Sequence, residues 1–572
     1  MQGVTRLREI FRTNRAAFAI LLLICVLHLG IRLYLINQQG FFYEETTTWS
    51  YSRSLASLIL AMVSDVHPPL YFSMMSVWTK LFGTSEIAFR LPSVLGSFLA
   101  LIVLMVFARE LDPRRNLVLP ILVGALYLCL PYDIHLSKTA RSWTLMVFLC
   151  GLFSYLYVWV TVRDKKNWFV GSLIVAICAF FIHYMTLLSV AATVISAALI
   201  QPTKANFRYA GKTLGIIFIF LLPWLLLVFP LQLIAKANIH SHFCFFWQKA
   251  VLPNLLAPIN PGTWNPFSLI EESAGIFHGM GFFLALVGVA IVLFRAGVCW
   301  ANRLSRFLML QVGVMIIFLL LSPMPLCNQR TMCIFLPPFL LLLAFALADL
   351  FTSKRLPAVV VSGAFITCFI AMSLSGFPYT SERGRMREIA EFLQPNWDNS
   401  RYPAVLLSPA THLLTLQYMQ SRGSAVFTRV FFAPYPVVSL DSPWYEPLHP
   451  EMMELPPKQV DRWKSGPQHE LGFVWTMNRL FAMNRNVTDV FYIREGSGDL
   501  FGCTEQGRVK LGRLEDEAQF AMTRIKRFGI WTVYHVQPRC GPPVSGASHN
   551  EAQASSCRVD AEQTAGPARG MQ

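Results

Sequence analysis

The architecture of the chain follows from residues 40–46, GFFYEET, and from the apolar run at residues 17–36 that precedes them. Glu44 and Glu45 therefore stand just after a segment of the length that crosses a bilayer, about 20 apolar residues. A carboxylate at a membrane surface is costly to remove from water, so such a pair indicates a function. We interpret it as a general base beside a lipid-borne substrate.

Composition places the chain among multi-span membrane proteins. Of its 572 residues, 54% are hydrophobic and 14% are charged, whereas soluble domains carry about 25% charged residues. Long apolar runs recur at residues 17–36, 91–108, 117–131, 142–162, 168–182, 185–200, 214–235, 276–294, 307–322, 333–351 and 357–375. We predict an all-α polytopic membrane domain with about 11 transmembrane helices, spanning residues 1–375.

The basic residues predict which connections face the cytoplasm. They are concentrated at residues 6–15, 109–115, 163–166, 204–212, 295–306 and 354–355. These segments alternate with connections that are poor in Lys and Arg, and positively charged loops stay on the cytoplasmic side. The pattern also accounts for much of the net charge of +16. Because the basic residues form no single stripe, we expect no nucleic-acid partner.

After residue 375 the composition changes to that of a soluble domain. Segments with helix or strand patterns lie at residues 385–393, 404–407, 411–419, 425–427, 489–493 and 531–536. They predict a small α/β domain at residues 376–540, which an odd number of spans places on the outer side. Residues 541–572 are rich in Gly, Pro, Ser, Ala and Gln, and we expect them to be disordered.

The first outer connection, residues 37–90, is too long for a simple link. We predict that it forms juxtamembrane helices, at residues 48–63 and 70–82, which hold the acidic pair near the lipid boundary. Asp65 and His67 lie between these helices. We assign both residues to substrate binding. The alternative is structural, with Asp65 as a helix or turn cap and His67 as part of a Pro-Pro turn.

Three cations on the outer side run against the general charge trend. Lys138 and Arg141 lie in a short second connection, and Arg330 lies in the last one. Cations placed there suit an anionic headgroup or phosphate, which Arg contacts in a bidentate manner. The alternative is anchoring of these side chains at the lipid headgroups.

The order of these motifs resembles the C superfamily of membrane glycosyltransferases. The similarity is greatest to the bacterial branch that resembles protein O-mannosyltransferases and the lipid A aminoarabinose and galacturonic acid transferases. Its motifs are the acidic pair, HPPLY at 67–71, AFRLPS at 88–93, SKTARSW at 137–143, His183-Tyr184, and Gln329-Arg330 leading into Leu336-Pro337. The resemblance covers the chain up to about residue 350.

The resemblance implies a polyprenyl-phosphate sugar donor and a catalytic acid in the first outer connection. It also implies a bacterial inner membrane location with a periplasmic C-terminal domain, and a role for Tyr184 in substrate binding. The family has Asp-Glu at the acidic pair, so we assign the base to Glu44 and place Glu45 second. Trp143 stands where the family has Tyr.

These assignments predict a glycosyltransferase that moves a sugar to an acceptor hydroxyl on a glycan, lipid or protein. A carboxylate takes the proton of the hydroxyl, and Arg or Lys side chains stabilise the departing phosphate. The alternative is a polytopic transporter or lipid flippase, although we find no internal repeat that favours it.

We expect no cofactor and no metal. His240 and His242 are far in sequence from Glu271 and Glu272, which is a weak pattern for metal ligands. A phosphate is already a good leaving group, and the nearby cations meet its charge.

Overall fold

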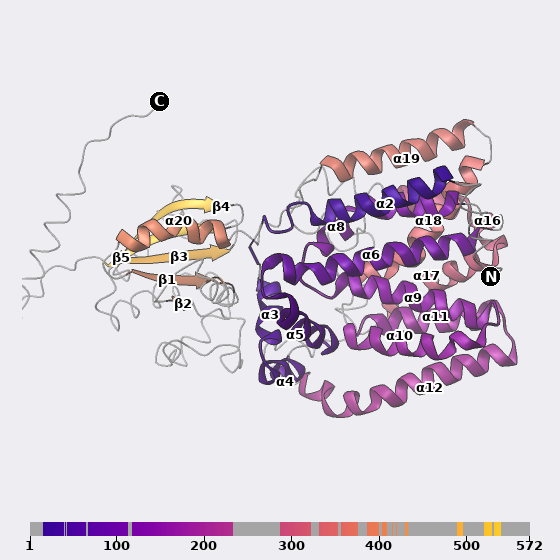
Figure 1. Ribbon diagram of the computed structural model, residues 1–572, viewed down its shortest axis with the longest axis horizontal. Coiled ribbons are helices and arrows are strands. Elements are labelled where there is room, and N and C mark those ends of the chain that lie inside the picture. Colours follow the sequence, from indigo (N-terminus) through magenta and orange to yellow (C-terminus); the bar gives the residue numbers. More distant parts are fainter. Residues whose placement is uncertain are drawn as a thin grey trace, which may run out of the picture. The chain divides into compact units, whose positions relative to one another are not determined.

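The computed structural model describes residues 15–38, 40–41, 43–64, 67–112, 117–232, 286–321, 331–352, 356–375, 386–399, 403–408, 415, 419, 430–432, 489–495, 520–528 and 531–538. The chain divides into two compact units, Met1–Gly384 and Arg385–Gln572. Figure 1 shows helices in the first unit, and a sheet with one helix in the second.

Helices form the described part of the first unit. In chain order they are α2 (Arg15–Leu33), α3 (Tyr43–Ser52), α4 (Leu55–Ser64), α5 (Leu70–Phe82), α6 (Glu86–Leu111), α7 (Val118–Leu128), α8 (Pro131–Ser137), α9 (Trp143–Thr161), η1 (Lys166–Trp168), α10 (Phe169–Ile182), α11 (Thr186–Ile200), α12 (Lys204–Leu227), α16 (Ala296–Ala301), α17 (Arg303–Leu321), η2 (Thr331–Phe335), α18 (Leu336–Thr352) and α19 (Leu356–Ser375). The expectation of a mostly helical membrane unit is confirmed.

Within the described residues, five helical segments are long and apolar enough to cross a membrane. They are Arg15–Leu33, Glu86–Leu111, Trp143–Thr161, Lys204–Leu227 and Cys333–Phe351. Helices α7 and α8 together would make a sixth, and Lys166–Ile182 and Thr186–Ile200 are shorter apolar helices. The larger number of spans that we expect from the sequence stays a prediction.

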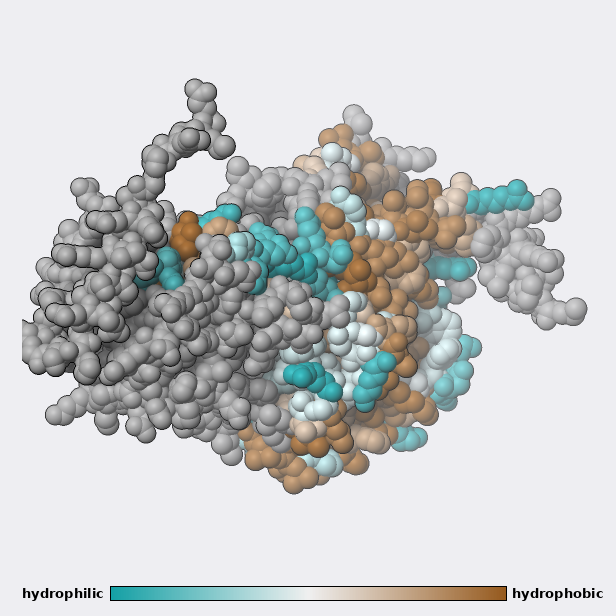
Figure 2. Space-filling model, turned by 60° about the vertical axis from the view of Figure 1, so that its left-hand side comes forward, coloured by the Kyte–Doolittle hydropathy of each residue, from teal (hydrophilic) through white to brown (hydrophobic). Residues whose placement is uncertain are grey.

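The exposed surface of the helices in this unit is largely apolar, as a lipid-facing surface must be. Figure 2 shows hydrophobic residues over much of the helical part of the face in view. Exposed side chains include Leu22 and Val26 of α2 and Phe218 and Ile219 of α12. Contiguous apolar surface of this kind is rare on soluble proteins, and it suits contact with lipid tails.

The predicted span at residues 117–131 is not one straight helix. Helix α7 ends at Leu128, α8 begins at Pro131, and their axes differ by 63°. Leu130 has an extended backbone conformation, which the residue before a proline favours because the proline ring clashes with a helical one. The break turns α8 away from α7.

Helix α6 is central to the unit because it packs against α2, α7, α8 and α9. Its approach to α9 depends on Gly96, where an added Cβ atom would lie 2.9 Å from Thr144 Oγ1 and 3.0 Å from Leu145 N. Small residues let two helix backbones approach closely inside a membrane. Gly96 therefore lets α6 and α9 pack closely.

The first outer connection contains helices, as predicted, but residues 48–63 do not form one helix. Helix α3 ends at Ser52, and α4 starts at Leu55. Ser54 separates them, because its hydroxyl accepts a hydrogen bond from Ser57 N and caps the start of α4. The following helix, α5, has the predicted bounds, 70–82.

The second unit contains a five-stranded sheet in the order β2-β1-β3-β5-β4. Its elements are α20 (Met386–Asn399), β1 (Pro403–Ser408), β2 (Val430–Phe432), β3 (Asp489–Glu495), β4 (Phe520–Phe528) and β5 (Trp531–Pro538). Strands β2, β1 and β3 are parallel, while β5 is antiparallel to both β3 and β4. Buried Met386, Ile389 and Leu393 recur at helical spacing along α20.

The predicted segments at 404–407, 489–493 and 531–536 lie inside β1, β3 and β5. Strands β2 and β4 coincide with none of the predicted strands. The predicted strand at 425–427 and the tail at 541–572 lie outside the described residues. The soluble nature of this unit and its outer location stay predictions.

Candidate active site

Glu44 and Glu45 lie in the first turn of α3. The positive end of the helix dipole is there, so carboxylates are favoured. Both are buried, with exposed fractions of 8% for Glu44 and 1% for Glu45. A buried carboxylate needs partners, and the two residues have different ones.

Glu45 is bound in a complete ion pair with Arg90 of α6. Its Oε1 lies 2.8 Å from Arg90 Nε, and its Oε2 lies 2.7 Å from Arg90 Nη2. The backbone N–H of Ala140 also donates to Oε1, at 2.8 Å. This bidentate geometry is the strong form of an Arg–carboxylate contact. Glu45 therefore joins α3, α6 and the segment that follows α8.

Arg90 also holds the connection between α2 and α3. Its Nη1 donates to the carbonyl of Ile36 at 2.6 Å, and its Nη2 donates to the carbonyl of Gly40 at 3.2 Å. In the sequence Arg90 stands out only as part of the motif at 88–93, and its role was not predicted. Its position beside the apolar run at 91–108 is the signal that could have indicated a carboxylate partner.

Glu44 lies beside Arg141 and His67. Its Oε2 is 3.9 Å from Arg141 Nε, and its backbone carbonyl accepts from Arg141 Nη1 at 3.4 Å. Arg141 Nη2 is 3.3 Å from His67 Nε2. Since a guanidinium only donates, the imidazole Nε2 is the acceptor, and the proton of the neutral ring lies on Nδ1. The structure thus gathers three predicted site residues from separate segments.

Aromatic rings line this cluster. The ring of His183 is 5.4 Å from that of His67 and 5.0 Å from that of Trp143, between centroids. Arg141 lies 6.0 Å from the centre of the Trp143 ring. The sequence motifs contain His183 and Trp143, but the site prediction omitted both. Their rings complete one wall of the cluster, hereafter the Glu44 cluster: Glu44, His67, Arg141, Trp143 and His183.

Lys138 has a different contact. Its Nζ donates to the carbonyl of Tyr34 at 2.8 Å. Burial, together with the nearby charges of Arg32 and Arg90, lowers the pKa of Lys138 to about 8. This cation therefore braces the segment after α2, and its role in phosphate binding stays a prediction.

Tyr184 connects three parts of the helical unit. Its hydroxyl donates to Gln232 Oε1 at 2.6 Å and accepts from Trp224 Nε1 at 2.8 Å. Gln232 Nε2 in turn donates to the carbonyl of Met62, near the end of α4. The contact of Tyr184 with substrate stays a prediction, whereas its contacts with Trp224 of α12 and with Gln232, which binds α4, are structural.

The remaining site predictions lie outside the described residues. They concern Asp65 and Arg330. His240, His242, Glu271 and Glu272, which form only a weak pattern for metal ligands, also lie outside the described residues. Across the part of the chain that the structure describes, no group of three His, Cys, Asp or Glu side chains could hold a metal ion.

Residues 66–229 match the family model described as dolichyl-phosphate-mannose-protein mannosyltransferase. The matched range contains His67, Arg141 and His183, and it begins after the acidic pair. No curated protein sequence matches the chain.

Two solved membrane proteins have a similar fold over most of the chain. ArnT from Cupriavidus metallidurans bound to undecaprenyl phosphate is 11% identical with a TM-score of 0.51, and the match covers 90% of this chain and 97% of that one. The archaeal oligosaccharyltransferase AglB from Archaeoglobus fulgidus, in complex with an inhibitory peptide and a dolichol-phosphate, is 11% identical with a TM-score of 0.52, covering 94% and 75%. At this identity the likeness shows the fold alone.

Proposed function

We propose that this chain, which has the fold of the C superfamily of membrane glycosyltransferases, transfers a sugar from a polyprenyl-phosphate donor to an acceptor hydroxyl. The fold and the motif resemblance support the reaction class. The observation that carries the proposal is the Glu44 cluster, where a carboxylate and a guanidinium lie together beside two histidines. Proton removal and phosphate stabilisation need these two groups.

The identity of the base follows from the contacts of the two glutamates. Both oxygens of Glu45 already accept short hydrogen bonds from Arg90, and one also accepts from Ala140 N. Both oxygens are therefore occupied by contacts that join α3 to α6 and to residue 140, which suits a structural role. Glu44 belongs to the cluster that contains Arg141 and His67. We therefore assign proton removal to Glu44 and the support of its helix to Glu45.

The reaction is a direct displacement at the anomeric carbon. Glu44 takes the proton of the acceptor hydroxyl while the hydroxyl oxygen forms a bond to that carbon. The bond from the carbon to the phosphate oxygen breaks, and the phosphate leaves with the electron pair. Arg141 meets the developing charge with its planar donors, and attack opposite to the leaving group inverts the anomeric centre.

His67 suits a role at the same phosphate. Its Nε2 accepts from Arg141 Nη2 at 3.3 Å, which orients the guanidinium. His183 Nδ1 accepts from the backbone N–H of Met185 at 3.2 Å, and its ring packs against those of His67 and Trp143. His67 therefore positions Arg141 for the phosphate, and His183 supports His67.

The apolar surface of the helical unit and the lipid carriers bound by the structural neighbours support a membrane setting with a lipid-linked donor. We place the protein in a bacterial inner membrane, with the site and the second unit on the periplasmic side. The acceptor is a glycan, a lipid or a protein.

The experiment is transfer by the purified protein from a labelled short-chain polyprenyl-phosphate sugar to envelope extracts of a deletion strain. We expect the label to appear on one envelope component, the acceptor that lacks this sugar in the deletion strain. Movement of a fluorescent polyprenyl-phosphate sugar across vesicles, without any transfer, would replace this function by that of a flippase.

The same assay tests for a metal. Because Arg141 meets the phosphate charge, we expect transfer to persist in a strong chelator. Activity that disappears with the chelator and returns with one divalent cation would contradict this expectation and would make His240, His242, Glu44 and Glu45 candidates for its ligands.

A further inference from the structure

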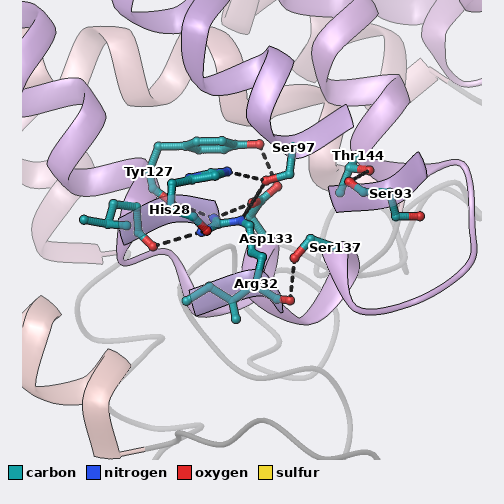
Figure 3. Close-up of polar contacts among 10 residues, drawn as sticks. His28, Arg32, Ser93, Ser97, Tyr127, Asp133, Ser137 and Thr144 are labelled. Carbon is teal, nitrogen blue, oxygen red and sulfur yellow. Dashed lines mark hydrogen bonds and ion pairs between the residues drawn. The ribbon is translucent and has the colours of Figure 1, made fainter. Parts of the chain in front are cut away.

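A second polar cluster lies inside the helical unit, apart from the Glu44 cluster. It consists of His28 and Arg32 of α2, Ser97 of α6, Tyr127 of α7 and Asp133 of α8, and Figure 3 shows their side chains converging. Arg32 and Asp133 are both fully buried. Such groups are costly inside a membrane unless their partners are complete, so the cluster needs an explanation. It is named the Asp133 cluster below.

Both oxygens of Asp133 accept hydrogen bonds. Oδ2 is 2.6 Å from Arg32 Nη2 and also accepts from the hydroxyl of Ser97, while Oδ1 accepts from the Tyr127 hydroxyl at 2.6 Å. The single hydroxyl hydrogen of Ser97 is thus used. His28 Nε2, 3.0 Å from Ser97 Oγ, must therefore be the donor. The donor and the acceptor of each of these hydrogen bonds are therefore defined, which favours one arrangement of these side chains.

Arg32 also satisfies the backbone at the break between α7 and α8. Its Nη2 donates to the carbonyl of Tyr127 at 3.2 Å, and its Nη1 donates to that of Leu128 at 3.4 Å. The last carbonyls of a helix have no partner within it, and they carry the negative end of its dipole. Non-helical backbone at membrane depth is tolerated only where such groups are satisfied. The cation therefore stabilises the bend.

The bend leads directly into the Glu44 cluster. Helix α8 ends at Ser137, and the next residues fold tightly, with Arg141 N donating to the carbonyl of Thr139 at 2.8 Å. Ala140 N donates to Glu45 Oε1, and the carbonyl of Ala140 accepts from Thr48 Oγ1 of α3. Two hydrogen bonds thus join the segment after α8 directly to α3.

Helix α6 holds both clusters on one face. Arg90, Ser93 and Ser97 follow each other at helical spacing, so their side chains lie on the same side. Arg90 binds Glu45, Ser93 Oγ donates to the carbonyl of Arg141 at 3.0 Å, and Ser97 donates to Asp133. This polar stripe sets the position of residues 138–142 relative to α3.

We propose that Asp133 is a positioning residue for sugar transfer: through Arg32, Ser97 and Tyr127 it fixes the bend of α7–α8, and thereby the backbone of residues 138–142 that carries Arg141. The inference rests on the proposed function, because the positioned groups are those of the transfer site. Asp133 itself does not contact the Glu44 cluster.

Two variants test the inference. Tyr127→Phe removes one hydrogen bond to Asp133 and keeps both charges. The double variant Arg32→Gln, Asp133→Asn removes both charges together, so that neither is left buried alone. The readouts are transfer per folded molecule and hydrogen–deuterium exchange of the amides at residues 138–142. Tyr127→Phe is conservative enough to fold should the double variant fail.

We expect faster exchange at residues 138–142 in both variants. We also expect turnover per folded molecule to fall by about tenfold or more in the double variant, because an ångström of misplacement in a site is costly. In combination with Arg141→Lys the losses should be less than additive, since both act through one side chain.

The matched control is Gln311→Met. Gln311 of α17 is buried and donates to Ser154 Oγ and Thr193 Oγ1, in a polar network of α9 and α11. This variant should lower thermal stability and leave the exchange of residues 138–142 and the turnover unchanged.

The outcomes separate the two proposals. Normal exchange and normal turnover per folded molecule in the Asp133-cluster variants would overturn the positioning role and leave the transfer function intact. A wild-type protein that transfers no sugar would overturn the function, while the exchange of residues 138–142 would still decide whether Asp133 holds this segment.

Discussion

Two acid–arginine pairs in the helical unit differ in how closely the charged groups approach. One is Asp133 with Arg32, and the other is Glu44 with Arg141. Asp133 Oδ2 lies 2.6 Å from Arg32 Nη2, and both groups are wholly buried. Glu44 Oε2 lies 3.9 Å from Arg141 Nε, beyond hydrogen-bond length, and both side chains keep some exposure. Short, complete pairs hold backbone in place, whereas a wider pair keeps its charges adjacent without fixing either group to the other.

The difference matters for catalysis because a base must accept a proton and a phosphate ligand must accept a substrate. Both oxygens of Asp133 already accept short hydrogen bonds from Arg32, Ser97 and Tyr127. A guanidinium with all its donors committed has none for a leaving group. The Glu44–Arg141 pair therefore has the geometry of a site, and the Asp133–Arg32 pair has the geometry of a scaffold.

The largest effect should come from Glu44→Gln. Loss of a well-placed base typically costs about 10²–10⁴-fold in turnover, and the amide has the size of the carboxylate, so the fold should be kept. The measurement is transfer from a polyprenyl-phosphate sugar at equal amounts of monodisperse protein. Glu110→Gln is the control, since Glu110 lies near the C-terminal end of α6, away from Arg90, and pairs with Arg163. Normal turnover in Glu44→Gln would remove Glu44 from the reaction.

Breaking the ion pair between Glu45 and Arg90 should act mainly on stability. Arg90→Ala leaves Glu45 as a buried charge without its arginine, which typically costs about 3–5 kcal/mol. The double variant Arg90→Met, Glu45→Leu should recover much of this loss, because neither charge remains. Thermal unfolding in detergent measures both. Equal destabilisation by the single and double variants would show that the pair contributes more than compensation of charge.

A smaller effect is expected at Arg141. Arg141→Ala should raise the apparent KM for the donor, because contacts to the phosphate are lost. Arg141→Lys should restore the affinity only in part, since an ammonium does not reproduce a planar fork of donors. Titration of the donor in the transfer assay distinguishes them. An unchanged KM in both variants would assign Arg141 to the protein fold.

The smallest effect should be the dependence of stability on pH at Lys138. Its pKa is lowered from 10.5 to about 8 by burial and by Arg32 and Arg90. Between these values the unfolded chain binds the proton and the folded chain does not. Stability from this group therefore rises as pH increases from about 8 towards 10.5, and it is constant below that window. Comparison of Tm against pH with Lys138→Met measures it, and a parallel pair of curves would contradict the assignment.

The sequence predicts the Glu44 cluster in part because its members belong to short motifs. Glu44, His67 and Arg141 were expected near one another from their common placement on the outer side. Their exact partners were not predictable, since the contact of Arg141 with His67 joins residues far apart in sequence. Lys138 shows the limit, because its contact with the carbonyl of Tyr34 depends on where the chain bends.

The Asp133 cluster was missed for the same physical reason. Hydropathy shows that Arg32 and Asp133 lie near apolar runs, but their pairing spans 101 residues and depends on helix packing. The break before Pro131 carries a local signal, yet the run at 117–131 has enough apolar residues to suggest one span. Composition predicts how many apolar residues a segment has, but not whether a proline divides it.

The bend between α7 and α8 also bears on how the protein is made. Helix α7 has 11 residues, which at about 1.5 Å per residue gives about 16 Å, well short of the roughly 30 Å of a bilayer core. When synthesis reaches the end of α7, Arg32 has already left the ribosome, but its partner Asp133 has not yet been synthesised. We expect the insertion machinery to keep α2 from the lipid until α8 emerges, and crosslinking of α2 in stalled chains of increasing length would show its release only after residue 133 has left the ribosome.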